Sequence, residues 1–198
     1  LGLNYIYKSM AIVDLAGALV GVRSLNIRGC SVSMPYKEAV LPLLDSLDNT
    51  AKEIGSVNTI VNNDGILHGY NTDVIGAQKV LYSLGIRCND TILLLGAGGV
   101  SRAILFALRE IGCRRVKVSN RNPEKLDYLN EIMQFEPIAW EKRSTVESDL
   151  IINATSIGMA PLIDYCPVET QAISLSNTVL DVVVSPFETR LIALARSM

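Results

Sequence analysis

The sequence predicts an α/β fold in two domains, each built around a mainly parallel β-sheet. A length of 198 residues fits two small domains or one large one. Short apolar runs alternate with stretches of helical periodicity, which is the pattern of strand–helix–strand units. The segment 85–90, Gly-Ile-Arg-Cys-Asn-Asp, has the composition of a linker. We therefore expect domains at residues 1–86 and 87–198.

The first domain contains several short elements. Strands are expected at 4–10, 27–32, 57–62 and 66–70, and helices at 14–25, 35–44, 49–54 and 72–85. Asp14 and Thr72 are suitable N-cap residues, and Pro35 suits the first turn of a helix. The turn Asn63-Asp64-Gly65 is expected to join the last two strands in a hairpin.

The second domain has longer apolar strands. Thr91 to Leu95 is a continuous apolar run, as expected for a parallel strand that is covered on both faces. Further strands are expected at 115–119, 149–153 and 178–183, with helices at 99–111, at 123–134 and from about 187. This alternation predicts a parallel sheet.

The bulk composition excludes several classes of protein. Apolar residues make up 49% of the chain, which is ample for a buried core, and the formal charge is only −2. That charge recruits neither nucleic acid nor an anionic membrane. No apolar run approaches the about 18 residues of a membrane span, and no signal peptide is visible.

The cysteines indicate neither a metal site nor a disulfide framework. The chain has four widely spaced cysteines, no C-x-x-C pair and a single histidine, so no zinc site is expected. Free thiols in a reducing cytoplasm are the ordinary interpretation, and they involve Cys30, Cys88, Cys113 and Cys166.

A glycine-rich loop follows the first strand of the second domain and opens a helix. In Gly96-Ala-Gly-Gly-Val-Ser101, Gly96 permits a tight turn and Gly98 lets the backbone approach a pyrophosphate. Ser101 is small enough for close packing of helix and strand, and the amides of Gly99 and Val100 are expected to point at phosphates. Because a strand precedes this loop and a helix follows it, we interpret it, including Ala97, as a Rossmann dinucleotide-binding loop.

The next strand ends in a basic turn, Asn120-Arg-Asn-Pro-Glu-Lys125. An NAD site needs an acidic residue there to accept from the ribose 2′-hydroxyl. Arg121 instead suits a 2′-phosphate, Lys125 adds a second cation, and Asn120 and Asn122 can donate. We therefore predict NADP as the cofactor, although an ordinary solvated basic turn has the same composition.

Another polar turn, Asn153-Ala-Thr-Ser156, follows a strand at its carboxyl end, the edge where cofactors lie in open α/β sheets. Thr155 and Ser156 are candidates for contact with the nicotinamide ribose. On local pattern alone, a simple strand-end turn is nearly as good an interpretation.

A nicotinamide enzyme that interconverts an alcohol and a ketone needs an acid–base group near the reacting oxygen. His68 lies in the predicted hairpin and is expected to be exposed. Lys37 follows Pro35-Tyr36 in the first turn of a helix, where the dipole disfavours another cation. A lysine placed there stabilises the fold poorly and is suited to proton transfer. Asp73 is a candidate partner that orients the ammonium.

Six motifs occur in an order that resembles the shikimate dehydrogenase family, most closely its shikimate dehydrogenase-like branch. They are Ser31-Val-Ser-Met-Pro-Tyr-Lys37, Ser56-Val-Asn-Thr59, Tyr70-Asn-Thr-Asp73, Gly96-Ala-Gly-Gly-Val-Ser101, Ser119-Asn-Arg121 and Asn153-Ala-Thr-Ser156. The resemblance implies a substrate domain, then an NADP domain, with the active site between them. It implies NADPH-dependent reduction of 3-dehydroshikimate to shikimate, a step of chorismate and aromatic amino acid biosynthesis, in a cytoplasmic protein.

The resemblance also implies roles for residues of the first domain. Lys37 matches the catalytic lysine of the family and Asp73 its aspartate partner, which also contacts substrate. Asn58 matches a ligand of a substrate hydroxyl. Ser33 takes the place of a substrate-binding threonine and keeps the hydroxyl. The partners expected are a cyclic hydroxy acid and a second copy in a homodimer, with no nucleic acid, membrane or metal.

Two positions depart from the family pattern. Ser31 replaces a substrate-binding asparagine, and Val184 stands where a substrate-contacting tyrosine follows the strand that ends near Asp181. Each lost hydrogen bond weakens shikimate binding by about 1 kcal/mol or more. Because the chain begins without methionine and ends at a helix, we expect a fragment without the family's early serine pair and late glutamine.

Three functions therefore remain open on the sequence. The first is an NADP-dependent dehydrogenase of shikimate or a related acid such as quinate. The second is a relative with a different small substrate, which Ser31 and Val184 favour. The third is a cofactor-binding protein without catalysis, against which Lys37 and Asp73 argue.

Overall fold

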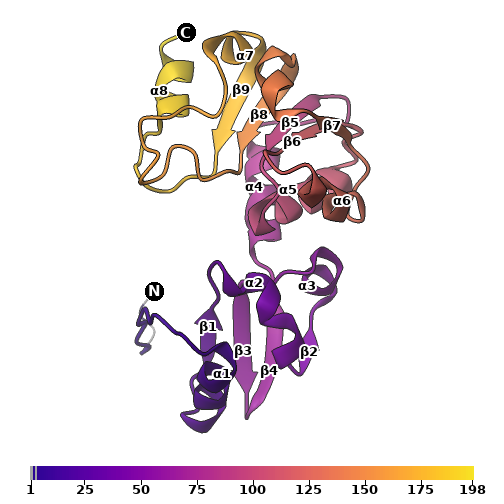
Figure 1. The fold of residues 1–198 in the computed structure, drawn as a ribbon. Coiled ribbons are helices and arrows are strands. Elements are labelled where there is room, and N and C mark those ends of the chain that lie inside the picture. Colours follow the sequence, from indigo (N-terminus) through magenta and orange to yellow (C-terminus); the bar gives the residue numbers. More distant parts are fainter. Residues whose placement is uncertain (1, 3) are drawn as a thin grey trace. The chain divides into compact units, whose positions relative to one another are not determined.

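The computed structural model describes residues 2 and 4–198. The chain divides into two compact units, Leu1–Tyr70 and Asn71–Met198 (Figure 1). The two-domain α/β fold that the sequence predicts is confirmed. Helix α4 (Asp73–Ser83), which we expected before the boundary at 86/87, groups with the second unit because it packs along α5 (Gly99–Ile111).

The first unit contains a four-stranded sheet in the order β1-β3-β4-β2. Its strands are β1 (Gly29–Ser31), β2 (Ser46–Leu47), β3 (Thr59–Asn63) and β4 (Ile66–Tyr70). Strands β1 and β4 both pair antiparallel with β3, and only β2 and β4 pair in parallel. The prediction of a mainly parallel sheet is therefore wrong for this unit. The predicted hairpin is confirmed, and its short turn forces β3 and β4 to run antiparallel.

The helices of this unit are α1 (Leu15–Ser24), α2 (Tyr36–Ala39), the 3-10 turn η1 (Leu41–Leu43) and α3 (Asn49–Ile54). As predicted, Asp14 caps α1, and its Oδ1 accepts from the Gly17 amide at 3.0 Å. The helix expected from Pro35 to residue 44 is interrupted instead. Helix α2 ends at Ala39 because Pro42 has no amide to continue the ladder.

The core of the first unit lies between α1 and the sheet. Leu19 and Val22 of α1 pack with Ile60 of β3 and Leu67 of β4. The strand expected at 4–10 is absent, because these residues pair with no strand in the described part of the chain. Tyr5 and Tyr7 of this segment are exposed. Alternation of side chains indicates strand propensity, but a strand also needs a neighbour for its backbone groups.

The second unit contains a five-stranded, wholly parallel sheet in the order β7-β6-β5-β8-β9. The strands are β5 (Thr91–Leu95), β6 (Arg115–Ser119), β7 (Glu136–Ile138), β8 (Ser148–Asn153) and β9 (Ser176–Asp181). From β5 the chain builds outward to β7, then crosses to β8 on the other side of β5. This is the strand order of the Rossmann fold, with its switch point between β5 and β8.

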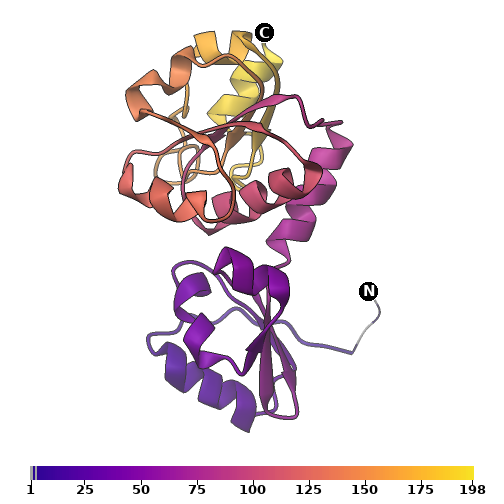
Figure 2. The same ribbon diagram turned by 90° about the vertical axis from the view of Figure 1, so that its right-hand side faces the viewer.

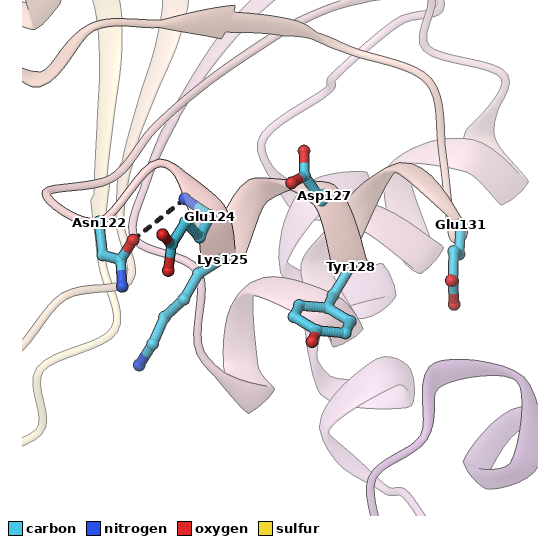
Figure 3. A pocket seen from close by; sticks show the side chains of 6 residues that line it. All are labelled: Asn122, Glu124, Lys125, Asp127, Tyr128 and Glu131. Atoms are coloured by element: carbon cyan, nitrogen blue, oxygen red, sulfur yellow. Dashed lines mark hydrogen bonds between the residues drawn. The ribbon is translucent and has the colours of Figure 1, made fainter.

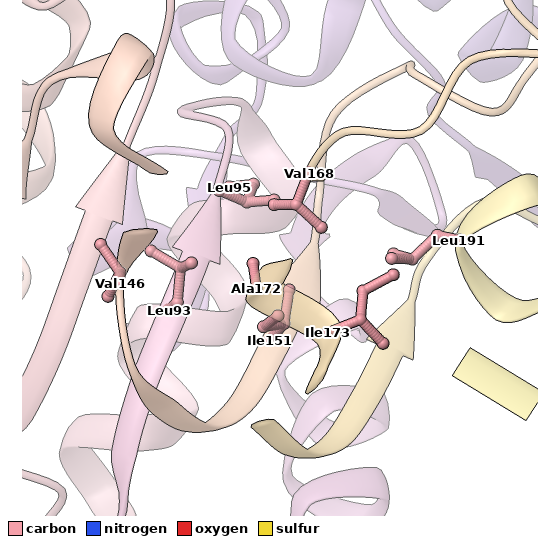
Figure 4. Packing of buried hydrophobic residues seen from close by; sticks show 8 residues of the cluster. All are labelled: Leu93, Leu95, Val146, Ile151, Val168, Ala172, Ile173 and Leu191. Atoms are coloured by element: carbon pink, nitrogen blue, oxygen red, sulfur yellow. The ribbon is translucent and has the colours of Figure 1, made fainter. Parts of the chain in front are cut away.

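Helices cover both faces of this sheet. Besides α4 and α5, the unit has α6 (Glu124–Asn130), the 3-10 segment η2 (Trp140–Thr145), α7 (Thr170–Ser174) and α8 (Arg190–Arg196). Alternate residues Leu93, Leu95 and Ile151 pack against α7 and α8 (Figure 4). Because alternate side chains of a strand point to opposite faces, Ile92 and Leu94 face the side that α5 covers (Figure 2).

Among the residues that the structure describes, no helix is long and apolar enough to cross a bilayer. All four cysteines are free thiols. The bounds expected for α5 and β6 are confirmed, whereas β2, β7 and α7 were not predicted. The helix expected at 123–134 ends already at Asn130, and the one expected from about 187 begins at Arg190.

Candidate active site

Three loops meet at the carboxyl ends of β5, β6 and β8. The Gly96 amide, directly after β5, donates to the Ser119 carbonyl at the end of β6 over 2.9 Å. The Ala154 amide, directly after β8, donates to the Leu95 carbonyl over 2.8 Å. Backbone hydrogen bonds therefore hold the glycine loop against both neighbouring turns, at the switch point of the sheet.

Gly96 is required by its surroundings. Its φ of +108° lies in a region that side chains rarely adopt, and a Cβ placed there lies 2.7 Å from the Ala154 carbonyl oxygen. Gly96 is also buried. The turn predicted at this position is confirmed, and only glycine fits it without strain.

Gly98, unlike Gly96, has free space at the position of a Cβ atom. It is the N-cap of α5, and a Cβ built on it meets no atom within 4 Å. The amides of the first turn, including those of Gly99 and Val100, have no acceptor within the helix. An open backbone beside these donors, at the positive end of a 13-residue helix, fits a pyrophosphate group. Ala97, between the glycines, is half-buried.

Ser101 supports the close packing that the sequence indicates. It is fully buried, and its hydroxyl lacks a hydrogen-bond partner among the described residues. A small side chain at this buried position fits the close packing of helix and strand that the sequence predicts. The same holds for Ser119 at the end of β6, which is also buried without a partner for its hydroxyl.

The basic turn after β6 is shaped by its two asparagines. The Asn120 side-chain amide donates to the Asn122 carbonyl over 2.7 Å, and Asn122 Oδ1 accepts from the Glu124 amide at 3.0 Å. Their side chains therefore order the turn and the start of α6. Arg121 and Lys125 are both exposed, which leaves two cations available to an anionic group beside the glycine loop.

A shallow pocket lies along the exposed side of α6 (Figure 3). Its lining residues are Asn122, Glu124, Lys125, Asp127, Tyr128 and Glu131. Three carboxylates in this lining make it unsuited to a phosphate. Only Asn122 and Lys125 belong to the predicted cofactor site, so this pocket is distinct from the glycine loop.

The turn after β8 is held by Asn153, which is completely buried. Asn153 Oδ1 accepts from the Thr155 amide at 3.1 Å and from its hydroxyl at 2.7 Å. The Thr155 Oγ1 in turn accepts from the Ile157 amide at 3.1 Å. The Thr155 hydroxyl thus takes part in shaping the turn, while Ser156 is exposed at its tip.

Sequence reasoning missed Asp181 at the end of the neighbouring strand β9. Asn153 Nδ2 donates to Asp181 Oδ1 over 3.0 Å. Burial raises the pKa of the nearby Cys166 thiol, and the charge of Asp181 raises it further. The signal was present, because Asp181 is a charged residue at the carboxyl end of an apolar strand.

The first unit gathers four predicted residues around the end of β1. The Val32 amide donates to the Asn58 carbonyl over 2.8 Å, and Ser31 pairs with Thr59 across the sheet. The Lys37 carbonyl accepts from the Val57 amide at 2.8 Å. This bond ties the first turn of α2 to the segment that leads into β3.

Side-chain exposure within this group varies. Lys37 and Asn58 are half-buried, whereas Ser31 and Ser33 are exposed. The Ser33 carbonyl accepts from the Tyr36 amide at 3.0 Å, which starts the turn of α2. The structure therefore brings Ser31, Ser33, Lys37 and Asn58 into one region of a single unit.

Asp73 and His68 occupy different settings. Asp73 is the first residue of α4, and its amide donates to Asn71 Oδ1 over 3.0 Å. Lys37 and Asp73 belong to different units, so their pairing stays a prediction. His68 lies on β4, half-buried, with Nδ1 hydrogen-bonded to Ser46 Oγ. The expectation of an exposed histidine is wrong, because β2 covers it.

The fold and the glycine loop define a two-domain α/β protein whose second domain is a dinucleotide-binding domain of the Rossmann type. Family models give the particular family. The model described as "Shikimate dehydrogenase substrate binding domain" matches residues 1–60, and "Shikimate / quinate 5-dehydrogenase" matches residues 78–184. The chain belongs to the shikimate dehydrogenase family, as its ordered motifs indicate.

Curated relatives and solved structures agree with this assignment. The NADP-dependent shikimate dehydrogenase of Moorella thermoacetica is 38% identical over 98% of this chain and 70% of its own length. A shikimate dehydrogenase-like protein of Haemophilus influenzae is 36% identical over 100% of this chain and 73% of its own. The Thermus thermophilus shikimate 5-dehydrogenase, solved with NADP(H) and shikimate, superposes with a TM-score of 0.81 at 35% identity, covering 95% and 70% of the two chains.

Proposed function

We propose that this protein is an NADP-dependent oxidoreductase that interconverts 3-dehydroshikimate and shikimate, or a closely related cyclic hydroxy acid such as quinate. The observation that carries the proposal is the glycine loop at the switch point, followed on the next strand by a turn with two exposed cations, Arg121 and Lys125. Membership of the shikimate dehydrogenase family supports the substrate class.

The second domain holds the cofactor, and NADPH supplies the hydride when it is bound. The amides of Gly98, Gly99 and Val100 bind the pyrophosphate at the start of α5, beside the backbone of Gly96 and Ala97. Arg121 and Lys125 bind the 2′-phosphate, which an NAD site with an acidic residue at this turn repels. Asn120 and Asn122 order that turn, and Thr155 with Ser156 lies beside the nicotinamide ribose.

Most residues proposed to bind the substrate and transfer the proton lie in the first unit, and Asp73 begins α4 of the second. Lys37 donates a proton to the carbonyl oxygen that becomes the alcohol, and Asp73 orients its ammonium and contacts a substrate hydroxyl. Asn58, Ser31 and Ser33 donate to the remaining hydroxyls. The bond between the Lys37 carbonyl and the Val57 amide fixes the backbone of Lys37 beside Asn58.

Consumption of NADPH with 3-dehydroshikimate tests this function directly. Lys37→Ala is expected to lower kcat by about 10²-fold or more, the contribution of a general acid. Lys52→Ala, on the exposed side of α3, is the matched control and should leave kcat unchanged. Unchanged turnover of the Lys37 variant contradicts the assigned role of that lysine.

A substrate panel tests the identity of the hydroxy acid. Ser31 puts a shorter hydroxyl in place of an asparagine amide, and Val184, which is 88% exposed after β9, puts an apolar side chain in place of a tyrosine. If kcat/KM is higher for quinate or another cyclic acid than for shikimate, that acid is the substrate of this protein. NADPH binding without turnover on any hydroxy acid contradicts the catalytic proposal.

We further propose that the protein works in the cytoplasm as a homodimer. Four free thiols support a reducing compartment, where thiols persist. Sedimentation equilibrium of the purified protein tests the dimer, and a monomer at micromolar concentration contradicts it.

A further inference from the structure

We propose that Asp181 is a positioning residue that sets the orientation of Asn153 and thereby the shape of the turn at 153–158, beside which the nicotinamide is held. The proposal rests on the function proposed above. It assigns to Asp181 neither substrate nor cofactor contact, because its carboxylate is occupied within the protein.

Three donors converge on the Asp181 carboxylate. Asn153 Nδ2 and the Val183 amide both donate to Oδ1 over 3.0 Å. The Thr189 hydroxyl donates to Oδ2 over 2.7 Å. Ionised carboxylates only accept hydrogen bonds, and bonds to a charged acceptor are stronger than neutral ones.

This acceptor-only character favours one orientation of the Asn153 amide, the same one that the Thr155 amide and the Ile157 carbonyl require. Asn153 presents its amide nitrogen to Asp181, and its oxygen faces the turn. That oxygen accepts from the Thr155 amide at 3.1 Å and from the Thr155 hydroxyl at 2.7 Å. The same Nδ2 also donates to the Ile157 carbonyl over 3.0 Å, which closes the turn. A flipped amide would place nitrogen against the Thr155 backbone amide, which can only donate, and oxygen against the Ile157 carbonyl, which can only accept.

Thr189 extends this arrangement to α8. It is buried, caps α8, and accepts from the Ile192 amide at 3.4 Å. Its Cβ and Cγ2 lie 3.4 Å from the position of a Cβ on Gly158, whose φ is +98°. One carboxylate therefore joins the ends of β8 and β9 to the start of α8.

The same strands carry a natural control at their opposite ends. Asp149, near the start of β8, accepts from the Thr91 amide at 2.7 Å and from Asn177 Nδ2 at 3.0 Å. Like Asp181 it is a half-buried carboxylate that links β8 to β9, but it lies at the amino edge of the sheet, away from the glycine loop. If Asp181 only stabilised the fold, removal of the carboxylate at position 181 or at position 149 should have similar effects.

The test compares Asp181→Ala, Asp181→Asn and Asp149→Ala in the purified protein by kinetics and by hydrogen exchange. Asp181→Ala should lower kcat by roughly ten- to a hundredfold, since small misplacements of reacting groups have effects of that size. The primary deuterium isotope effect on kcat should rise as hydride transfer becomes slower. Asp181→Asn keeps the shape and one acceptor, so it should recover part of kcat. Asp149→Ala should lose stability while kcat and the isotope effect stay unchanged.

Hydrogen exchange of the Thr155 and Ile157 amides gives a readout that needs no activity. Exchange at both should accelerate in Asp181→Ala and not in Asp149→Ala. Equal exchange rates of these amides in the two alanine variants overturn the proposal. So does a kcat that falls in both variants only in proportion to the fraction of protein that is folded. If the wild type binds NADP but turns over no hydroxy acid, the proposed function fails, and the exchange measurement alone still decides the role of Asp181.

Discussion

A methyl group on Gly96 would lie 2.7 Å from the carbonyl oxygen of Ala154, closer than two such atoms approach in proteins. The two residues follow β5 and β8, the strands on either side of the switch point. The Ala154 amide also donates to the Leu95 carbonyl over 2.8 Å, so the turn after β8 is bonded to the end of β5.

Gly96→Ala should therefore destabilise the second domain by about 2 kcal/mol or more, through the clash and through its positive φ. NADP affinity should fall with it, because the loop that we propose to bind pyrophosphate must shift. Urea unfolding and fluorescence titration with NADP measure the two effects. Gly76→Ala on α4 is the control, since nothing lies within 4 Å of its Cβ position and alanine favours helix. Equal stability of the two variants would contradict the crowding at Gly96.

Arg121→Ala should raise the Kd for NADP about tenfold and leave the Kd for NAD unchanged, because only NADP carries the 2′-phosphate. Rising salt concentration should reduce the difference in the Kd for NADP between wild type and variant, since both cations of the turn are exposed and salt screens their charge. The exposed Arg114, just before the opposite end of β6, supplies the control variant Arg114→Ala. A preference of the wild type for NAD would refute the assignment of this turn.

The first domain should show acid-sensitive stability at Asp45. The hydrogen bond from Arg23, and secondly that from the Leu67 amide, holds the pKa of Asp45 below its ordinary range. A lowered carboxyl pKa stabilises the fold above the unfolded value of about 3.9, and this contribution disappears as the pH falls through the folded value.

Asp45→Asn should therefore lower the urea midpoint at pH 7 and have a much smaller effect near pH 3. Asp64→Asn, at the exposed tip of the hairpin, makes the same change of charge and serves as the control. An equal effect of Asp45→Asn at both pH values would mean that its charge contributes nothing.

Thiol reagents should distinguish two cysteines that lie close together. Cys88 is exposed, whereas burial raises the pKa of Cys113 to about 11. At pH 8 roughly one Cys113 in a thousand is then the reactive thiolate. Ellman's reagent should modify Cys88 quickly and Cys113 only on unfolding, with Cys88→Ser and Cys113→Ser identifying each phase. If the folded Cys88→Ser variant still lost a thiol as fast as Cys88 reacts in the wild type, this order would be contradicted.

The sequence predicted the second domain better than the first. Continuous apolar strands such as Thr91 to Leu95 are unambiguous, and glycines at residues 98 and 112 delimit α5. Strands β2 and β7 have only two and three residues, too few to show a period, and β7 contains Pro137. The segment 4–10 has the composition of a strand, but pairing partners cannot be inferred from local composition.

The predicted site shows the same division. Gly96, Gly98 and Ser101 were recognisable because local backbone geometry determines their type. Asp181 stands out only as a charged residue at the end of an apolar strand, and its contact with Asn153 could not be predicted because it depends on β8 and β9 being neighbours, with the two residues 28 positions apart. The pairing of Lys37 with Asp73 was proposed from motif order and remains a prediction.

The backbone bonds from Gly96 to Ser119 and from Ala154 to Leu95 have a practical consequence for engineering. In the proposed cofactor site, main-chain atoms of the glycine loop form the cradle for the pyrophosphate, and side chains of the turn 120–125 determine the cofactor preference. Evolution, or a laboratory library confined to Arg121 and Lys125, can therefore exchange one hydride donor for another without rebuilding the catalytic scaffold.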